Sequence, residues 1–466
     1  MKVEPLADGW KSLGEHLAGL SGRTVDYSDL FVQSASGHSV VFEKGRVEEV
    51  SSAASSGVGA RVILNEHSLF SHSPDSSPMG AWRCMEETLA RAGFPLVGKP
   101  PVTPGDSPDF EPIRLKAPAT DPLGEVDRSI RNASPLVRQV TLRTKVSGRR
   151  TLVVRGDGKI VSDLRFHSLF AVQVTVERKG TIQTGYEVRA FQTGPGNFWD
   201  DLSPLEVGQQ ALARALLMLE ACQCPAGRMP VVLSGQAGGT MIHEACGHGL
   251  EADIVQKDYS VYRERLGEQV ASPLVTLVDD ATIPKAYGSY ETDDEGTPAQ
   301  RTVLIEQGVL KAYLTDVQSA RKGGLPLTGN GRRGSYRNLP LPRMSNTFLL
   351  PGEEPFEGLL EKAGKGLLVT KMGGGQVNPT SGDFVFQVTE AFLIENGRIG
   401  KPVRGATLIG NGPETLKQIE AIGSDLHFEP GLCGKDGQSV PVTDGQPSLL
   451  IRNLLVGGCE IGDGEG

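Results

Sequence analysis

Residues 229–255 read MPVVLSGQAGGTMIHEACGHGLEADIV. The stretch begins as a short apolar strand, turns at a pair of glycines and continues as a candidate helix that carries His243, Glu244 and His248. The familiar zinc-hydrolase pattern, H-E-x-x-H, places both of its histidines on one helical face. Here the spacing between the histidines is one residue longer. The stretch therefore predicts a metal site only if the helix departs from regular geometry.

The extra residue matters because a regular α-helix turns by about 100° per residue. Side chains four positions apart lie ~40° from each other around the helix axis, whereas side chains five positions apart lie ~140° apart. A single-turn π-bulge absorbs one residue and returns the fifth position to a place over the first. Gly247, which directly precedes His248, and the small Ala245 and Cys246 would ease such a distortion. We therefore predict a π-bulge near Gly247.

The two histidines also need a further ligand, because a catalytic zinc commonly takes three protein ligands and leaves one position for water. The residues alone leave several candidates open, namely Glu251, Asp253, His427, Cys433 and Cys459. Cys433 lies in the glycine-rich segment GLCGKDGQS, close to Lys435. A positive neighbour lowers the pKa of a thiol, so Lys435 would favour the thiolate that a metal binds.

Composition limits the classes of function. The chain has 466 residues, a formal net charge of −9 and a pI of about 5.5. A protein that binds nucleic acid through the phosphate backbone needs a positive field, so direct nucleic-acid binding is not expected. No apolar stretch resembles a signal peptide or a membrane span, and the six cysteines lack the spacing of a disulfide framework. We expect a cytoplasmic protein with reduced cysteines and no membrane partner.

The patterning predicts an α+β fold in four parts. Residues 1–100 are expected to form an N-terminal α+β segment with an antiparallel sheet and long helices. Residues 101–121 are a proline-rich linker. Residues 122–228 form a central α/β segment that ends in a bridging helix. Residues 229–466 form the C-terminal catalytic domain, which is dominated by a large antiparallel β-sheet and carries the metal-binding helix.

Local signals add detail to the central segment. We predict a helix around residues 122–143, followed by strands that turn at Asp157 and Gly158. The bridging helix has the clearest start in the chain. Ser203 can cap it, and Glu206 completes a capping box.

Three further stretches are candidate contributors to a site. In KMGGGQ (residues 371–376), Gly373, Gly374 and Gly375 would let a peptide strand lie close to the backbone, although a tight turn explains them equally well. Three of the arginines in the segment 329–343, namely Arg332, Arg333 and Arg343, are candidates to bind a substrate carboxylate or a dimer partner. ETDDEGTP (residues 291–298) groups four acids and is expected to be a structural loop rather than a second metal centre.

Several long motifs carry a wider resemblance. In chain order they are GGTMIHEACGHGLEAD, DDEGTPAQRTVLIEQGVLKAYLTD, GNGRRGSYRNLPLPRMSNTFLLPG, GGGQVNPTSGDFVFQVTEAFLIENGRIGKPVRGATLIGNGPETL and CGKDGQSVPVTDGQPSLLIRNLLVGG. Together they resemble the TldD/PmbA family of zinc metallopeptidases. The match is dense from about residue 230 to residue 458, and it continues more loosely through GRVEEVSSAASSGVGARVI in the N-terminal half.

The resemblance implies a set of roles. The family pattern is H-E-x-x-x-H, which makes His243 and His248 zinc ligands and Glu244 the general base. The third ligand of the family lies in a C-G-K-x-G-Q stretch, which here contains Cys433. Cys459 falls in a short tail beyond the usual V-G-G ending and is set aside. One Zn²⁺ per catalytic subunit and hydrolysis of unfolded or extended peptides are implied.

The resemblance also implies a partner. The family includes a non-catalytic sister, TldE or PmbA, which lacks the zinc motif and pairs with the catalytic subunit. This chain keeps every ligand position, so it resembles the catalytic subunit. We expect a homodimer or a heterodimer with a TldE/PmbA-like subunit.

One alternative comes from a different class of protein. A non-catalytic regulatory or binding protein could hold zinc as a structural metal. Such a metal would have four protein ligands and would give Glu244 no role.

Overall fold

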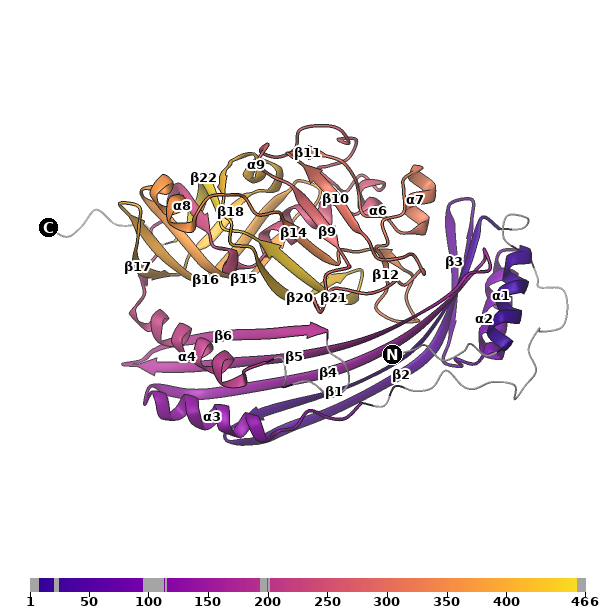
Figure 1. Cartoon of the computed structure of the whole chain (residues 1–466), viewed down its shortest axis with the longest axis horizontal. Helices are drawn as coiled ribbons and strands as arrows, with labels where there is room; N and C mark the ends of the chain where they lie inside the picture. Colours follow the sequence, from indigo (N-terminus) through magenta and orange to yellow (C-terminus); the bar gives the residue numbers. More distant parts are fainter. Residues whose placement is uncertain are drawn as a thin grey trace.

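The computed structural model describes residues 8–20, 25–94, 113, 115–192, 199 and 202–458. One long, curved sheet forms the N-terminal half, and the C-terminal half lies over it (Figure 1). The predicted α+β class is confirmed, because helices and large, mostly antiparallel sheets make up both halves. Most of the predicted linker 101–121 lies outside the described residues, which resume at Ile113.

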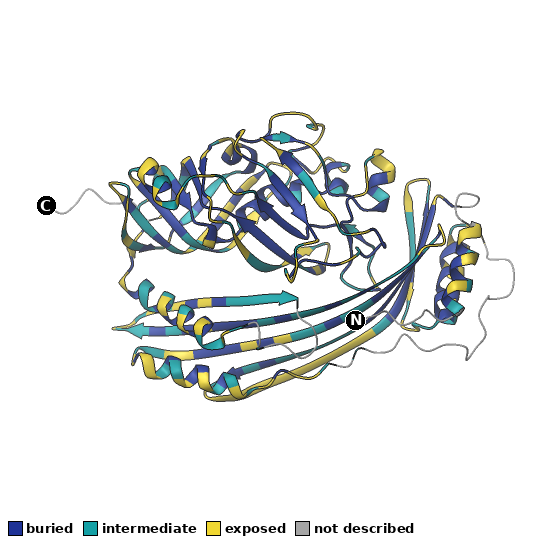
Figure 2. Ribbon diagram, in the orientation of Figure 1, coloured by how far each residue is buried: buried dark blue, intermediate teal, exposed yellow. Residues whose placement is uncertain are grey.

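Six strands form the N-terminal sheet, in the order β3-β2-β1-β4-β5-β6. Their bounds are β1 Tyr27–Glu43, β2 Arg46–Leu64, β3 His67–Ser73, β4 Val137–Arg155, β5 Ile160–Arg178 and β6 Thr181–Gln192. Because β1 pairs with β4, the predicted segments 1–100 and 122–228 contribute to a single sheet. The first part of β2 forms an exposed edge (Figure 2), since β3 covers only its second part.

Four helices cover one face of this sheet. They are α1 Asp8–Leu20, α2 Pro78–Arg91, α3 Asp121–Ala133 and α4 Pro204–Glu220. One hydrophobic cluster joins α1 and α2 to one end of the sheet, and another joins α3 and α4 to the other end. The opposite face meets the C-terminal half, where Phe31 and Val153 pack against Tyr336. No helix among the described residues is long and apolar enough to cross a membrane.

In the central segment, the predicted turn and helix cap are present, but one predicted helix is too long. Gly158 adopts a φ of +82° between β4 and β5, as the predicted hairpin turn requires. Ser203 caps α4 by accepting a hydrogen bond from the backbone N–H of Glu206 at 3.4 Å. The helix predicted around residues 122–143 is wrong in its second part, because α3 ends at Ala133 and β4 begins at Val137.

The C-terminal half contains a sheet that closes on itself, because β15 pairs both with β8 and with β16. Its strands are β7 Cys222–Gln223, β8 Gly227–Leu233, β15 Gly366–Val377, β16 Asp383–Glu395, β17 Arg398–Arg404, β18 Thr407–Asn411, β19 Ile419–Ile422 and β22 Leu449–Gly457. The predicted large antiparallel sheet is therefore present, with parallel pairs at β8–β15 and β7–β17.

A second sheet completes this half, in the order β11-β10-β9-β14-β21-β20. Its strands are β9 Leu277–Asp280, β10 Arg301–Glu306, β11 Val309–Leu310, β14 Asn346–Leu349, β20 His427–Lys435 and β21 Gln438–Gln446. The remaining elements of this half are short and include α7 Val317–Gly323, α8 Phe356–Ala363, α9 Gly412–Lys417, β12 Gly331–Arg332 and β13 Leu341–Pro342.

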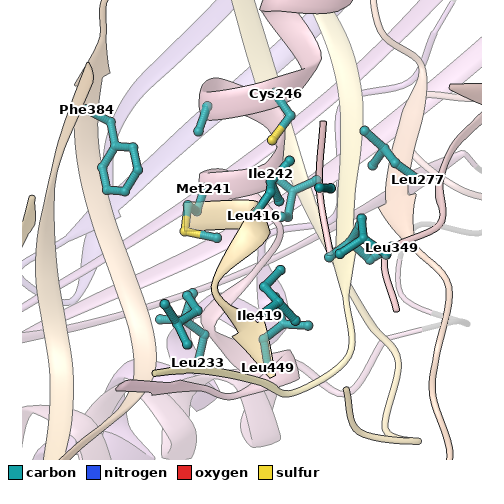
Figure 3. Close-up of a cluster of buried hydrophobic side chains, with 14 of the residues drawn as sticks. Leu233, Met241, Ile242, Cys246, Leu277, Leu349, Phe384, Leu416, Ile419 and Leu449 are labelled. Atoms are coloured by element: carbon teal, nitrogen blue, oxygen red, sulfur yellow. The ribbon is translucent and has the colours of Figure 1, made fainter. Parts of the chain in front are cut away.

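The helical segment after β8 is buried in the main hydrophobic core of the C-terminal half. Met241, Ile242 and Cys246 are buried there together with Leu233 of the closed sheet and Leu277 of the second sheet (Figure 3). Removing these side chains from water anchors the segment. These contacts thereby fix the position of the segment that carries His243 and His248.

Buried ion pairs join the two halves at loop 291–298. The Asp294 carboxylate pairs with Arg149 of β4 at 3.3 Å and with Arg165 of β5 at 3.2 Å. It also accepts a hydrogen bond from the backbone N–H of Arg333 at 2.8 Å. Burial opposes ionisation of Asp294, but Arg149 and Arg165 outweigh it and lower its pKa to about 2. The acidic loop therefore has the structural role that the sequence predicts.

The same loop contributes a second buried pair. Glu295 binds Arg61 of β2 at 2.7 Å, and Arg61 also binds Asp29 of β1. All three side chains are fully buried. A polar contact without access to solvent, between Glu295 and Arg61, thus connects the two halves.

We expect Asp294→Asn to destabilise the protein. Removing one partner of a buried ion pair costs about 3–5 kcal/mol, because the remaining charges stay uncompensated. Urea unfolding followed by circular dichroism would measure this loss. The matched control is Glu220→Gln, because Glu220 pairs with Arg178 on the surface, where such pairs contribute little. Equal unfolding midpoints for both variants would mean that Asp294 does not hold the halves together.

Candidate metal site

The helical segment that carries the two histidines is not regular. Its α-helical start, α5, spans Thr240–Ile242, a π-turn spans His243–Gly247, and a 3₁₀ turn spans His248–Leu250. In the π-turn the backbone N–H of His248 donates to the carbonyl of His243. The two imidazole rings consequently lie side by side, with centroids 5.0 Å apart. The π-bulge predicted from the H-E-x-x-x-H spacing is confirmed.

Close packing explains why a glycine precedes the second histidine. A Cβ atom at Gly247 would lie 2.0 Å from Sδ of Met344, although the backbone φ of Gly247 is an ordinary −55°. The helical segment ends at Leu250, since Glu251 is extended. A short helix, α6 Ala252–Val255, follows it.

The structure brings Cys433 to the two histidines. Cys433 lies on β20, and its Sγ is 3.5 Å from Nε2 of His248. One donor atom from each of His243, His248 and Cys433 lies within 4.8 Å of the others. Among the described residues, these three form the one such group of histidine, cysteine and acidic side chains.

The other candidates for the third ligand that the structure describes do not belong to this group. Glu251 and Asp253 bind Lys435 instead, and His427 stands exposed at the start of β20. Cys459 lies outside the described residues.

A carboxylate lies behind each histidine. Nδ1 of His243 is 2.6 Å from Oδ1 of Asp444 on β21, and Nδ1 of His248 is 3.0 Å from Oε2 of Glu251. Such contacts set the orientation of the rings and leave Nε2 of each ring to bind a metal. Burial would lower the pKa of His243, but Asp444 outweighs it and raises that pKa well above its usual range.

Lys435 forms ion pairs with Glu251 and Asp253 and not with the sulfur of Cys433. Its Nζ is 3.0 Å from Oε2 of Glu251 and 2.6 Å from Oδ1 of Asp253. Burial opposes the charge on Glu251, but Lys435 and His248 outweigh it and lower the pKa of Glu251 to about 2. The direct effect of Lys435 on Cys433 that the sequence suggests is replaced by this ion pair.

Cys433 is poised to be a thiolate. Burial opposes its ionisation, but hydrogen bonds with His243 and His248 and their positive charge outweigh it and lower the pKa of the thiol to about 5. In addition, Nη2 of Arg343 donates to Sγ at 3.1 Å. The surroundings of Cys433 therefore favour the thiolate, which is the form of cysteine that binds metals.

The donor set fits zinc. Nitrogen and sulfur donors at ~2.1 Å and ~2.3 Å from one tetrahedral ion lie about 3.5 Å from each other, which is the separation between His248 Nε2 and Cys433 Sγ. Imidazole and thiolate ligands suit zinc, whereas magnesium and calcium prefer oxygen.

Glu244 stands next to the first histidine with a free carboxylate. The residue is half-buried, and in the part of the chain that the structure describes its side chain makes no hydrogen bond or ion pair. Among the described residues, the Glu244 carboxylate is therefore not held by another side chain or by the backbone.

The three glycines are part of a strand. Gly373, Gly374 and Gly375 lie in β15, so the alternative of a tight turn is wrong. Beyond Val369, β15 pairs on one side only, with β16, among the described strands. The other edge of this stretch therefore has no strand partner among the described residues.

The two neighbouring arginines are engaged inside the protein. Arg332 donates to the carbonyls of Met344 and Pro441 at 2.5 and 2.7 Å. Arg333 is fully buried and donates to the carbonyl of Asp294 at 3.0 Å. These positions argue against a direct contact between either guanidinium group and a substrate.

Two residues of the site are missed or misread from the sequence. Asp444 lies in T-D-G-Q, which is typical of a turn, and only the pairing of β20 with β21 brings it behind His243. Arg343 is a candidate for a substrate or dimer contact in the sequence, but it binds Cys433 in the structure.

Comparison with known proteins agrees with this geometry. Residues 226–458 match the PmbA/TldA metallopeptidase C-terminal domain, residues 28–93 match domain 1, and residues 112–219 match the central domain. The metalloprotease TldD homolog of Haemophilus influenzae is 38% identical over 457 residues, which cover 94% of both chains. The chain belongs to the PmbA/TldD family of metallopeptidases.

Other members of the PmbA/TldD family are similar to the chain. A metalloprotease of Methanocaldococcus jannaschii is 33% identical and matches 90% of this chain and 94% of its own. A protein of Saccharolobus solfataricus named zinc metalloprotease TldD homolog is 32% identical and matches 65% of this chain and 67% of its own.

Two solved structures share the fold. A putative modulator of a DNA gyrase from Thermotoga maritima has a TM-score of 0.75 at 23% identity and matches 96% of this chain and 99% of its own. TldE of Thermococcus kodakarensis has a TM-score of 0.75 at 18% identity and matches 97% of this chain and 99% of its own.

We expect Glu251→Gln to weaken metal binding. The change keeps the shape of the side chain but removes the charge that holds His248, and loss of such a partner typically lowers metal affinity about 10–100-fold. Competition with a chelator of known affinity would measure the change. Glu268→Gln is the control, because Glu268 pairs with Arg265 at the surface. Equal affinities in the two variants would contradict this role of Glu251.

Proposed function

We propose that the chain is a zinc-dependent peptidase with one Zn²⁺ per chain. His243, His248 and Cys433 are the ligands, and Glu244 is the general base. The observation that carries the proposal is the convergence of two oriented imidazoles and a thiolate-prone cysteine. Glu244 directly follows His243 in the chain, and its carboxylate has no partner among the described residues. Membership of a metallopeptidase family supports the same reaction class.

The chemistry follows from these groups. When bound, zinc would supply a Lewis acid that lowers the pKa of water from about 15.7 toward ~7. Glu244 accepts the proton of the attacking water and delivers it to the leaving amine, which is typically worth about 10²–10⁴-fold in rate. Asp444 and Glu251 keep the two rings oriented, so little reorganisation is needed during the reaction.

The substrate class that we propose is an unfolded or extended peptide. β15 contacts the π-turn of the site, and its edge beyond Val369 is open for a further strand. An added strand gains affinity through main-chain hydrogen bonds, which tolerate many sequences. Gly373, Gly374 and Gly375 carry no side chains that would hinder its approach.

A partner of the same fold forms part of the proposal. The chain shares its fold with the TldE of Thermococcus kodakarensis, which supports a heterodimer with a TldE-like subunit or a homodimer. The cytoplasmic location stays a prediction.

A structural metal is the less favoured alternative. It needs four protein ligands, and among the described residues only three donors gather at the site. The Thermotoga maritima protein is described as a putative modulator of a DNA gyrase, but the net charge of −9 of this chain argues against direct contact with DNA.

The first test concerns Glu244. We expect Glu244→Ala to lose peptide cleavage by at least ~10²-fold while its zinc content stays that of the wild type. The readouts are hydrolysis of unfolded peptides, followed by mass spectrometry, and metal analysis of the same preparation. Glu268→Ala is the control. If Glu244→Ala and the wild type degrade the peptides equally, the hydrolase proposal fails.

A second test concerns the third ligand. We expect Cys433→Ala to lose most of its zinc, because two imidazoles alone hold the ion weakly. Cys459→Ala should keep its zinc and serves as the matched cysteine control. Metal analysis after dialysis would decide the assignment, and full zinc retention in Cys433→Ala would overturn it.

A further inference from the structure

The sulfur of Cys433 has a buried cation beside it. Nη2 of Arg343 lies 3.1 Å from Sγ of Cys433 and also donates to the carbonyl of the same residue at 2.7 Å. The side chain of Arg343 is completely buried. One guanidinium nitrogen therefore contacts both the backbone and the side chain of the proposed ligand.

The position of Arg343 is tightly constrained. Its backbone N–H donates to the carbonyl of Asn330 at 3.0 Å, and Nη1 lies 3.4 Å from the carbonyl of Gln438. The next residue, Met344, packs directly on Gly247 of the π-turn. The arginine is thus tied to the histidine segment and to the β20–β21 hairpin at the same time.

Arg343 also lacks a carboxylate partner. Within the described ranges, no aspartate or glutamate forms an ion pair with it. A buried charge is costly unless it is paired and hydrogen-bonded, and the thiolate of Cys433 is the anion that the Arg343 guanidinium contacts. The pair is therefore best described as guanidinium and thiolate.

We propose that Arg343 is a positioning residue that withdraws charge from the Cys433 thiolate. This inference rests on the proposed function, in which Cys433 is a zinc ligand. A thiolate donates more charge than an imidazole and weakens a metal as a Lewis acid. Hydrogen bonds to a ligating sulfur reduce that donation, and they are known to tune copper and iron–sulfur sites. Arg343 would thus preserve the Lewis acidity that a His-His-Cys ligand set would otherwise lose.

The test uses the full-length protein with Co²⁺ in place of zinc. Its near-ultraviolet absorption contains a sulfur-to-cobalt charge-transfer band if Cys433 is a ligand. In Arg343→Met we expect this band to move to longer wavelength, because a thiolate without its donor gives up charge more readily. Arg343→Lys keeps one cationic donor and should show a smaller shift.

Activity should change in a characteristic way. With zinc bound, we expect kcat for peptide hydrolysis to fall about 10–100-fold in Arg343→Met, with KM unchanged and full metal content. A purely structural role would instead lower the metal content and leave the band of the remaining cobalt protein in place.

Arg332→Met is the matched control. Arg332 is also buried, binds two backbone carbonyls and lies over the ring of Tyr290 at 5.1 Å, but it contacts none of the three proposed ligands. We expect the band of Arg332→Met to stay at the wild-type wavelength, whatever happens to its stability.

The outcomes separate the two proposals. A wild-type cobalt protein without a sulfur band would overturn Cys433 as a ligand and with it the proposed site. A wild-type band that does not move in either Arg343 variant would overturn the role of Arg343 and leave the proposed function standing. If Arg343→Met does not fold, Arg343→Lys alone decides, because it retains the buried charge.

Discussion

The hydrogen bond from the backbone N–H of His248 to the carbonyl of His243 is the contact on which the site depends. It closes a π-turn instead of an α-turn, and this turn brings two histidines that are five positions apart to the same side of the segment. The turn also places Gly247 directly beneath Met344. Arg343 directly precedes Met344, and its guanidinium group donates to the sulfur of Cys433. The packing of Met344 on Gly247 therefore helps to place this cation.

The β20–β21 hairpin supplies the rest of the site from one short piece of chain. Cys433 and Lys435 lie on β20, and Asp444 lies on β21. A sulfur, a cation and a carboxylate therefore reach the histidine segment together. Asp444 contacts His243, and Glu251 contacts His248. Each imidazole therefore has a carboxylate that orients it, and Lys435 pairs with Glu251.

The sequence carries the local features of this arrangement and misses the contacts between distant segments. Helical geometry is enough to predict the π-turn, because the turn depends only on residues that are close together in the chain. Only the family resemblance predicts Cys433 as the third ligand, since 185 positions separate it from His248. Asp444 has no local signal for its contact with His243, and nothing near Arg343 in the sequence indicates its contact with Cys433. The burial of Arg332 and Arg333 depends on how the two halves meet, which periodicity does not encode.

The irregular pairing of β15 has a consequence for self-association. Between Val369 and Gly375 its register against β16 shifts three times. A flat, unpaired strand edge can pair with any extended chain, including the same edge of another copy of the protein, which leads to aggregation. Bulges are one means by which natural sheets prevent this pairing. A short, flexible chain can follow a bent edge, whereas two rigid edges cannot pair along their length. The bulges therefore protect the protein from its own open strand.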